Sequence, residues 1–278
     1  MTRLVLVSVV ALAACGTSSP RPRTFGGDRP VELQVPAGFD DSRKYPLVLV
    51  LHGYGANGFL QEAVFGLANL PKAGDAFVLA PDGNTDSMGE QFWNADPACC
   101  DYDHTNPDDS GYLGKLLTDV MAAWPIDPQQ VLVIGHSNGG YMAYRMACDH
   151  ADVVTNIIVL AGAAASDPAT CTPSRAVDVL HLHGTADDMV PYSLAQPSVL
   201  QWATHDGCAQ TLTAGGTALD LDVTQPGAET TTQTVDGCPA GITLELWTMQ
   251  GVGHVPNFDG ATLAPLLFQY LGDHRRDN

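Results

Sequence analysis

The sequence predicts an α/β fold in which helices cover both faces of a mostly parallel sheet. The first observation is a series of short, continuous apolar runs, the type of strand that is buried on both faces. The second is that segments with apolar residues three and four apart, as in amphipathic helices, separate these runs. The third is the length of 278 residues, which suits a single domain of this class, and no internal repeat is visible.

The expected strands and helices alternate along the chain. An alternating strand is expected at 31–35, and continuous apolar strands at 46–51, 76–80, 130–134, 156–161, 177–182 and 242–247. The expected helices are 59–70, 111–123, 138–149, 193–206 and 261–271. Two polar stretches, 82–109 and 207–241, interrupt the alternation. We expect both to be loops over the carboxyl ends of the strands, where open α/β sheets bind ligands, and the second to carry a hairpin.

The first thirty residues are expected to precede the folded domain. Arg3, the apolar segment 4–12 and the sequence Leu12-Ala13-Ala14-Cys15 together resemble a bacterial lipoprotein signal peptide of residues 1–14. The resemblance implies cleavage before Cys15 and lipidation of that cysteine, and an ordinary secretory signal cut near Ala14 is the alternative. The apolar segment is too short to span a bilayer, which needs about 20 residues. Residues 15–30 are predicted to form a flexible tether, which leaves 31–278 as the domain.

The charge balance excludes one class of partner. Twelve Lys and Arg residues against 31 Asp and Glu give a formal charge of -19, which would repel a nucleic acid backbone. It also disfavours a polyanionic substrate, so a neutral substrate is expected. We expect a monomer that contacts a membrane only through a lipidated Cys15.

The cysteines predict disulfides. Six remain once Cys15 is set aside, an even number in a chain expected outside the reducing cytosol. We favour pairing Cys148 with Cys171 and Cys208 with Cys238, because a short stretch separates the members of each pair. The adjacent cysteines at 99 and 100 either bond to each other or stay free. A metal site is the competing interpretation, but the sequence contains no CxxC.

A candidate nucleophile lies between a predicted strand and a predicted helix. The segment Gly135-His136-Ser137-Asn138-Gly139 follows the apolar run 130–134 and precedes the helix 138–149. This is the strand, sharp turn and helix context that the G-x-S-x-G nucleophile elbow requires. Outside that context the same pattern would indicate a simple Gly/Ser turn.

A serine hydroxyl needs a histidine to accept its proton and an acid to orient the imidazole. His254 lies in a Gly-rich turn after the last predicted strand, and Asp187 follows the strand that ends near His183. The chain order Ser137, Asp187, His254 is that of the α/β-hydrolases. Asp188 is the alternative acid, and the spacing Asp-x-x-Val-Pro favours Asp187.

Two backbone amides are expected to bind the oxyanion of the tetrahedral intermediate. One is the N–H of Asn138, which follows the nucleophile, and the other is the N–H of Tyr54 in the loop after the strand 46–51. His181 and His183, which alternate on one strand, are interpreted as buried polar residues, with metal ligation as the alternative. The Asp-rich segment 96–109 is interpreted as a solvated face with a helix N-cap, because it lacks the mid-loop Gly and terminal Glu of a calcium loop.

Together these motifs resemble the secreted polyhydroxybutyrate depolymerase and feruloyl esterase-like family of α/β-hydrolases, over residues from about 24 to 272. The segments that carry the resemblance are Leu51-His-Gly-Tyr-Gly55, Pro81-Asp-Gly83, Phe92-Trp-Asn-Ala95 with Cys99-Cys100, Asp108-Asp-Ser-Gly-Tyr112, Gly135-His-Ser-Asn-Gly-Gly140, Leu160-Ala-Gly162, His183-Gly-Thr-Ala-Asp187 and Gly253-His254. The resemblance implies a serine esterase with its triad at Ser137, Asp187 and His254, and a substrate-side role for Trp93. A core aromatic is the alternative for Trp93.

The sequence therefore predicts an exported serine carboxylic-ester hydrolase that needs no metal or organic cofactor. The expected location is a lipoprotein at the outer surface or in the periplasm, or a secreted protein. The substrates suggested by the resemblance are 3-hydroxyalkanoate polyesters and feruloyl or acetyl esters of polysaccharide. Two other functions stay open: an acyltransferase that uses the same triad, and a surface-binding protein without catalysis.

Overall fold

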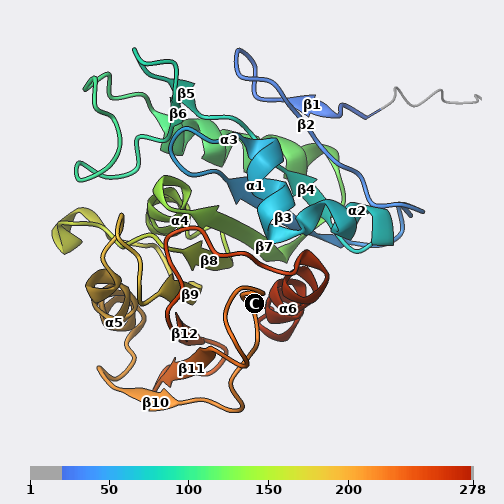
Figure 1. The fold of residues 1–278 in the computed structure, drawn as a ribbon. Helices are drawn as coiled ribbons and strands as arrows, with labels where there is room; N and C mark the ends of the chain where they lie inside the picture. The colour runs from blue at the N-terminus through green and yellow to red at the C-terminus, as the bar shows by residue number, and fades with distance from the viewer. Residues whose placement is uncertain (1–20, 277–278) are drawn as a thin grey trace, which may run out of the picture.

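A mixed eight-stranded sheet forms the centre of the protein, whose computed structural model describes residues 21–276. The strand order is β10-β11-β12-β9-β8-β7-β3-β4 (Figure 1). The strands from β4 to β12 in this order run parallel, and β11 and β10 add an antiparallel edge. The strands are β3 (Tyr45–Leu51), β4 (Phe77–Leu79), β7 (Ile126–His136), β8 (Asn156–Leu160), β9 (Asp178–Gly184), β10 (Leu212–Ala214), β11 (Thr230–Val235) and β12 (Leu244–Met249).

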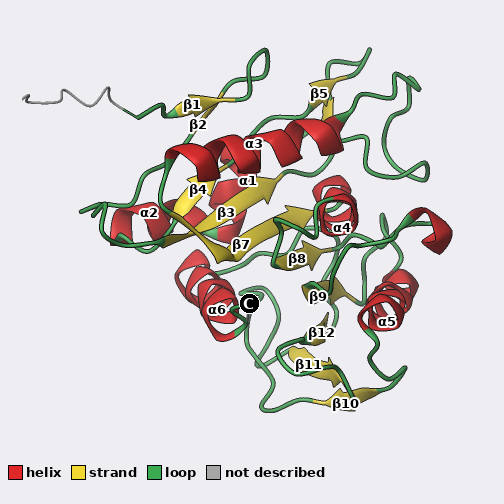
Figure 2. Cartoon of the chain, turned by 180° about the vertical axis from the view of Figure 1, so that it is seen from behind, coloured by secondary structure: helices red, strands yellow, loops and turns green. Residues whose placement is uncertain are grey.

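Helices cover both faces of the sheet (Figure 2). Apolar residues of α3, α4 and α5 pack in one core cluster, and those of α1, α2 and α6 pack in the other. The helices are α1 (Gly58–Phe65), α2 (Leu70–Ala73), α3 (Asp109–Ala123), α4 (Asn138–Asp149), α5 (Ala195–Asp206) and α6 (Gly260–Asp273), with short 3₁₀ turns at Leu67–Asn69, Pro168–Thr170 and Tyr192–Leu194.

The continuous apolar runs of the sequence follow from this two-sided burial. In β3, Leu47, Leu49 and Leu51 belong to one core cluster, and Val48 and Val50 belong to the other. Successive side chains of a strand point to opposite faces, so a strand covered on both faces must be apolar at every position. The predicted α/β class, with helices on both faces of a mostly parallel sheet, is therefore confirmed, and the helix predicted over 138–149 coincides with α4.

The domain begins earlier than the sequence indicated. β1 (Thr24–Phe25) pairs with β2 (Val31–Glu32), and the side chain of Phe25 is buried in the core. Arg29 forms an ion pair at 2.6 Å with the fully buried Asp109 at the start of α3. The C-terminal part of the predicted tether therefore packs on the domain, because contacts far along the chain outweigh its Ser, Pro and Gly content. The predicted signal peptide and Cys15 lie outside the described residues.

The two stretches that interrupt the alternation differ in their structure. The segment 82–109 contains β5 (Asn84–Thr85), which pairs with β6 (Gln91–Phe92). The segment 207–241 contains β10 and β11, so the expected hairpin is present, and it extends the central sheet at its edge. Disulfides join Cys208 to Cys238, Cys148 to Cys171 and Cys99 to Cys100. The two favoured pairings thus occur, and the adjacent cysteines bond to each other.

From residue 21 to residue 276, no helix combines the length and the apolar character that crossing a bilayer would require.

Candidate active site

Ser137 forms the turn between β7 and α4. β7 ends at His136 and α4 begins at Asn138, so the chain reverses at Ser137 alone, with φ 54° and ψ −121°. The N–H of Ser137 donates to the carbonyl of Leu160 at 2.9 Å, and this bond fixes the turn to the neighbouring strand β8. A positive φ is unusual for a residue that has a Cβ atom, and such strain is concentrated at functional sites.

The two glycines of the elbow are needed because backbone passes close to both. A Cβ atom on Gly135 would collide with the carbonyl oxygen of Gly139, and one on Gly139 would collide with the carbonyl oxygen of Leu51. The start of α4 therefore lies directly on the ends of β7 and β3. This close approach leaves the Ser137 side chain at the carboxyl edge of the sheet, partly exposed.

Asp187 and His254 meet at the same edge of the sheet. Asp187 follows β9 and His254 follows β12, and these two strands are parallel neighbours. His254 Nδ1 lies 2.8 Å from Asp187 Oδ2, so the imidazole donates a hydrogen bond to the carboxylate. Asp188, the alternative acid, is exposed and is not hydrogen-bonded to His254.

Donors surround the carboxylate of Asp187. Its Oδ1 accepts the backbone N–H groups of Met189 and Val190, each at 2.9 Å. Burial by itself raises the pKa of Asp187, but the hydrogen bonds from His254, Val190 and Met189 outweigh it and leave this pKa below its ordinary value. Asp187 is therefore ionised at neutral pH, as an acid that orients an imidazole must be.

His136 links the serine turn to the turn that carries His254. Its Nε2 lies 2.9 Å from the carbonyl oxygen of His254, and the centroids of the two rings are 4.9 Å apart. A carbonyl only accepts, so Nε2 of His136 carries the hydrogen. Burial lowers the pKa of His136 to about 4, so the ring is a neutral donor at pH 7. His136 lies inside the G-x-S-x-G motif, at a position where the motif accepts any residue, so the pattern alone predicts no role for it.

The residue after His136 is Ser137, so the hydrogen bond of His136 joins the serine turn to the turn that carries His254. The hydrogen bonds of residues 21–276 include the one between His254 and Asp187 but none between Ser137 Oγ and His254 Nε2. In enzymes without substrate, such a bond is often long and shortens when substrate binds.

Tyr54 and Asn138 present backbone N–H groups that donate to no other group of the described chain. The loop of Tyr54 is held from both sides. The N–H of Gly83 donates to His52 Nε2 at 2.9 Å, and the N–H of Gly55 donates to the carbonyl of Gln91 at 2.9 Å. A pair of fixed, unused backbone donors beside the serine is the arrangement that an oxyanion hole requires.

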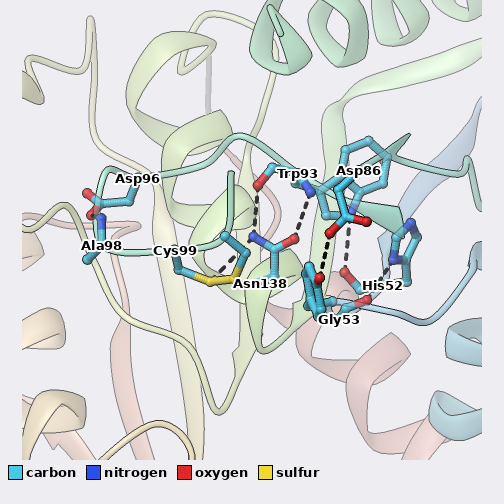
Figure 3. Close-up of a disulfide and its surroundings, with 10 residues drawn as sticks. His52, Gly53, Asp86, Trp93, Asp96, Ala98, Cys99 and Asn138 are labelled. Atoms are coloured by element: carbon cyan, nitrogen blue, oxygen red, sulfur yellow. Dashed lines mark hydrogen bonds between the residues drawn. A yellow bond between two sulfur atoms is a disulfide. The ribbon is translucent and has the colours of Figure 1, made fainter. Parts of the chain in front are cut away.

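The side chain of Asn138 connects the serine turn to the segment that supports Tyr54 (Figure 3). Its Oδ1 accepts the backbone N–H of Trp93 at 2.7 Å, and its Nδ2 donates to the carbonyl of Trp93 at 2.8 Å. Nδ2 also lies 3.7 Å from the sulfur of Cys99, in the disulfide with Cys100. The indole N–H of Trp93 in turn donates to the carbonyl of His52 at 3.1 Å.

Trp93 is fully buried, so in this structure its side chain cannot reach a substrate. It packs against the ring of His52, with 5.0 Å between the ring centroids, beneath the loop that carries Tyr54. The substrate-side role that the resemblance implied does not match this position, whereas a core aromatic, the alternative, does. The size and apolar character of an indole favour burial wherever its N–H can find an acceptor.

The Tyr54 side chain is also fixed. Its hydroxyl donates to Asp86 Oδ2 at 2.5 Å, and its ring packs edge-on against Tyr102 at a centroid distance of 5.3 Å. Asp86 Oδ1 accepts two backbone N–H groups of its own turn, those of Met88 and Glu90. The loop of Tyr54 is therefore attached to the β5–β6 segment by its side chain as well as by its backbone.

A cavity of about 210 Å³ lies beside α4. Tyr141, which lines it, is one helical turn from Ser137, and its N–H donates to the carbonyl of Ser137 at 3.0 Å. Trp202 adds a second aromatic wall, and Asp96 and Arg145 supply charged groups. Ser137, Asp187 and His254 are not among the residues that line it, so this cavity neighbours the candidate site and does not contain it.

The aspartates of 96–109 contact the chain itself. Asp101 accepts the N–H groups of Thr105 and Asn106, and Asp108 accepts the N–H of Gly111 as the N-cap of α3. Within 21–276, no three His, Cys, Asp or Glu side chains are arranged as a metal site.

Comparisons with known proteins identify the family of the chain. A protein-family model described as "Putative esterase" matches residues 23–234. Feruloyl esterase B of Piromyces equi is 25% identical over 244 residues, which cover 81% of this chain and 42% of that protein. "Putative esterase NocK" of Nocardia uniformis subsp. tsuyamanensis is 32% identical over 148 residues, which cover 53% of this chain and 41% of that protein. The matches thus span less than half the length of either relative.

Solved structures agree on the fold. The acetyl xylan esterase from Aspergillus awamori superposes with a TM-score of 0.65 at 16% sequence identity, over 87% of this chain and 93% of that one. The fold and the strand-turn-helix elbow define the protein as an α/β-hydrolase. The family match covers most of the chain, and the protein belongs to this esterase family, as its resemblance to feruloyl esterases indicated.

Proposed function

We propose that the protein is a serine carboxylic-ester hydrolase with Ser137 as nucleophile, His254 as general base and acid, and Asp187 as the orienting acid. The observation that carries the proposal is the 2.8 Å hydrogen bond between His254 and Asp187, at the strand edge where the Ser137 elbow stands. Membership of an esterase family supports the same chemistry.

In the first half of the reaction, Ser137 Oγ attacks the ester carbonyl carbon while its proton passes to His254 Nε2. The negative charge on the carbonyl oxygen is met by the N–H groups of Asn138 and Tyr54, each worth roughly 2.7 to 4 kcal/mol in comparable sites. His254 then gives the proton to the departing alcohol, and an acyl group stays on Ser137.

In the second half, a water molecule takes the place that the departed alcohol occupied and reacts with the acyl group on Ser137. His254 takes a proton from the water, the hydroxide adds to the acyl carbon, and the carboxylic acid leaves as Ser137 recovers its proton. Asp187 stays ionised and stabilises the imidazolium through both halves.

For the substrate, we propose neutral feruloyl or acetyl esters of polysaccharide. Two observations support this class: relatives are named feruloyl esterases, and the charge of -19 disfavours anionic substrates. A rate panel with methyl ferulate, acetylated xylan and 3-hydroxybutyrate oligomers tests the choice, and fastest turnover of the oligomers would favour a polyester hydrolase instead.

For the location, we propose that the protein is exported and held at a membrane by lipid on Cys15. The three disulfides support an oxidising compartment. Cys15→Ser should move the protein from the membrane fraction to the soluble fraction, and unchanged sedimentation would contradict the anchor.

The experiment that tests the chemistry compares Ser137→Ala with Ser174→Ala, a matched change at an exposed serine. We expect Ser137→Ala to abolish hydrolysis of a short p-nitrophenyl ester and labelling by a fluorophosphonate, with an unchanged melting temperature, and Ser174→Ala to affect neither. Retained turnover in Ser137→Ala would refute the assignment. Absence of labelling in the unmodified protein would favour a binding protein, and acyl transfer to an added alcohol in preference to water would favour an acyltransferase.

A further inference from the structure

Asp187 has a second imidazole beside it, on the side away from solvent. His183 Nε2 lies 3.3 Å from Asp187 Oδ2, the same oxygen that accepts from His254. The same nitrogen lies 2.9 Å from the carbonyl oxygen of Val190. His183 therefore faces both the carboxylate and the turn that holds it.

His183 is the end of a chain of three side chains. Its Nδ1 lies 3.0 Å from Nε2 of His181, and the two rings are nearly parallel, at 8°. His181 Nδ1 lies 2.9 Å from the hydroxyl oxygen of Tyr144, which comes from α4, the helix that packs on β7 and β8. The catalytic steps proposed above use none of these three residues.

Hydrogen-bond chemistry fixes the direction of this chain. The carbonyl of Val190 can only accept, so His183 Nε2 carries a hydrogen. In a neutral ring Nδ1 of His183 is then an acceptor, so His181 Nε2 must donate to it. His181 Nδ1 is in turn an acceptor, and the Tyr144 hydroxyl must donate to it.

The surroundings keep both rings neutral. His181 and His183 have no exposed surface and Tyr144 has 2%. Burial lowers the pKa of His181 well below its ordinary value, and proximity to His183 adds to this. Burial also lowers the pKa of His183, and this outweighs the opposing effects of the Val190 carbonyl and Asp187.

We propose that Tyr144, His181 and His183 form a one-way chain of hydrogen bonds that positions the carboxylate of Asp187, with His183 as the positioning residue. The inference rests on the proposed function only for the role of Asp187. Each donor in the chain points toward Asp187, so the bond dipoles add and present their positive ends to the carboxylate and its turn. The chain holds Oδ2 where His254 needs it, without adding a charge.

The direction of the chain can be measured without any turnover. In protein labelled with [¹⁵N]histidine, the imidazole nitrogen shifts distinguish the two neutral tautomers and the charged ring. Signals of His181 and His183 are assigned by their loss in His181→Gln and His183→Gln. At pH 7 we expect both rings to be neutral with the hydrogen on Nε2. A charged ring, or a hydrogen on Nδ1 of either residue, would overturn the proposal.

The positioning role is tested by kinetics on a short p-nitrophenyl ester. A displaced carboxylate misorients the base without altering substrate contacts, so His183→Phe should lower kcat roughly 10- to 100-fold and leave KM within about twofold. His183→Gln should recover most of this loss, because its amide can accept from His181 and donate to Val190. Tyr144→Phe, which removes only the hydroxyl, should lower kcat by a smaller factor, about threefold.

The matched control is Tyr270→Phe. Tyr270 is also buried, but its hydroxyl has no hydrogen-bond partner among residues 21–276, so its removal should leave kcat unchanged. Melting temperatures show whether each variant folds. If folded His183→Phe keeps its kcat, or if His183→Gln is as slow as His183→Phe, the positioning role is wrong. If the unmodified protein hydrolyses no ester, the proposed function fails, and the nitrogen shifts still decide whether the chain exists.

Discussion

His136 and His254, 118 positions apart in the chain, are joined by a 2.9 Å hydrogen bond from the first imidazole to the second residue's carbonyl. This bond ties the turn that carries Ser137 to the turn that carries the proposed base. The two turns leave different strands, β7 and β12, with β8 and β9 between them. The distance between the proposed nucleophile and the proposed base is therefore set in part by a neutral histidine to which the proposed reaction gives no proton-transfer step.

Removal of this bond should slow catalysis. His136→Ala is expected to lower kcat roughly tenfold, because the His254 turn loses its tie to the serine turn. His136→Gln, which can place an amide donor near the same carbonyl, should lose less. His104→Asn, a change at an exposed histidine, serves as the control. Equal kcat in His136→Ala and the unmodified protein would show that the turns hold their spacing without this bond.

The second prediction concerns the contact between Tyr54 and Asp86. Tyr54→Phe keeps the backbone N–H proposed for the oxyanion hole but loses the 2.5 Å hydrogen bond that fixes its loop. We expect kcat to fall by roughly three- to tenfold with little change in KM, since the donor is needed most in the transition state. Asp86→Asn should have a similar effect, and the double variant should be no worse than either single one. Additive losses would mean that the two side chains act separately.

The third prediction concerns the close approach of α4 to β3. Gly139→Ala places a Cβ atom against the carbonyl oxygen of Leu51, and backbone cannot move aside as a flexible side chain can. We expect the free energy of unfolding to fall by roughly 1 to 3 kcal/mol or more. Gly216→Ala is the control, because a Cβ atom there meets nothing within 4 Å. Urea denaturation of both variants measures the difference, and equal midpoints would contradict the packing argument.

The sequence alone predicts the parts of this protein that local patterns determine. The apolar runs locate the central parallel strands, and the G-x-S-x-G motif between a strand and a helix locates Ser137. The positions of Asp187 and His254 after predicted strands indicate that both residues lie at strand ends, and the strand order brings them together. These inferences succeed because strand period, glycine at a tight turn and the position of strand ends are properties of short segments.

The contacts that sequence reasoning missed join distant segments. Asn138 and Trp93 are 45 positions apart, and Tyr144 and His181 are 37 apart. No local sequence pattern predicts which buried donor will form a hydrogen bond with which acceptor, since that depends on packing across the sheet. The same reason explains residues 24–30, whose composition indicates a tether, although the burial of Phe25 and the ion pair of Arg29 hold them to the domain.

The fourth prediction concerns a buried carboxyl outside the candidate site. Asp206, at the end of α5, is buried, and neither of its side-chain oxygens has a hydrogen-bond partner among residues 21–276. Burial raises the pKa of Asp206 to about 7, and the nearby Asp178 adds to the effect. The folded protein therefore holds this proton over a range of pH in which the unfolded chain, with a pKa near 3.8, has released it.

The sign of the pH effect follows from this difference. Between about pH 4 and pH 7 the folded state binds the proton on Asp206 and the unfolded state does not. The free energy of unfolding therefore falls as the pH rises through this range. Asp206→Asn removes the charge that forms at high pH. It should raise the melting temperature at pH 8, by roughly 2 to 4 °C for each kcal/mol gained, and should have little effect at pH 4. Asp188→Asn, at an exposed position, should change neither value. A stabilisation by Asp206→Asn that is the same at both pH values would mean that burial of the charge is not its cause, because only the ionised form of Asp206 carries that cost.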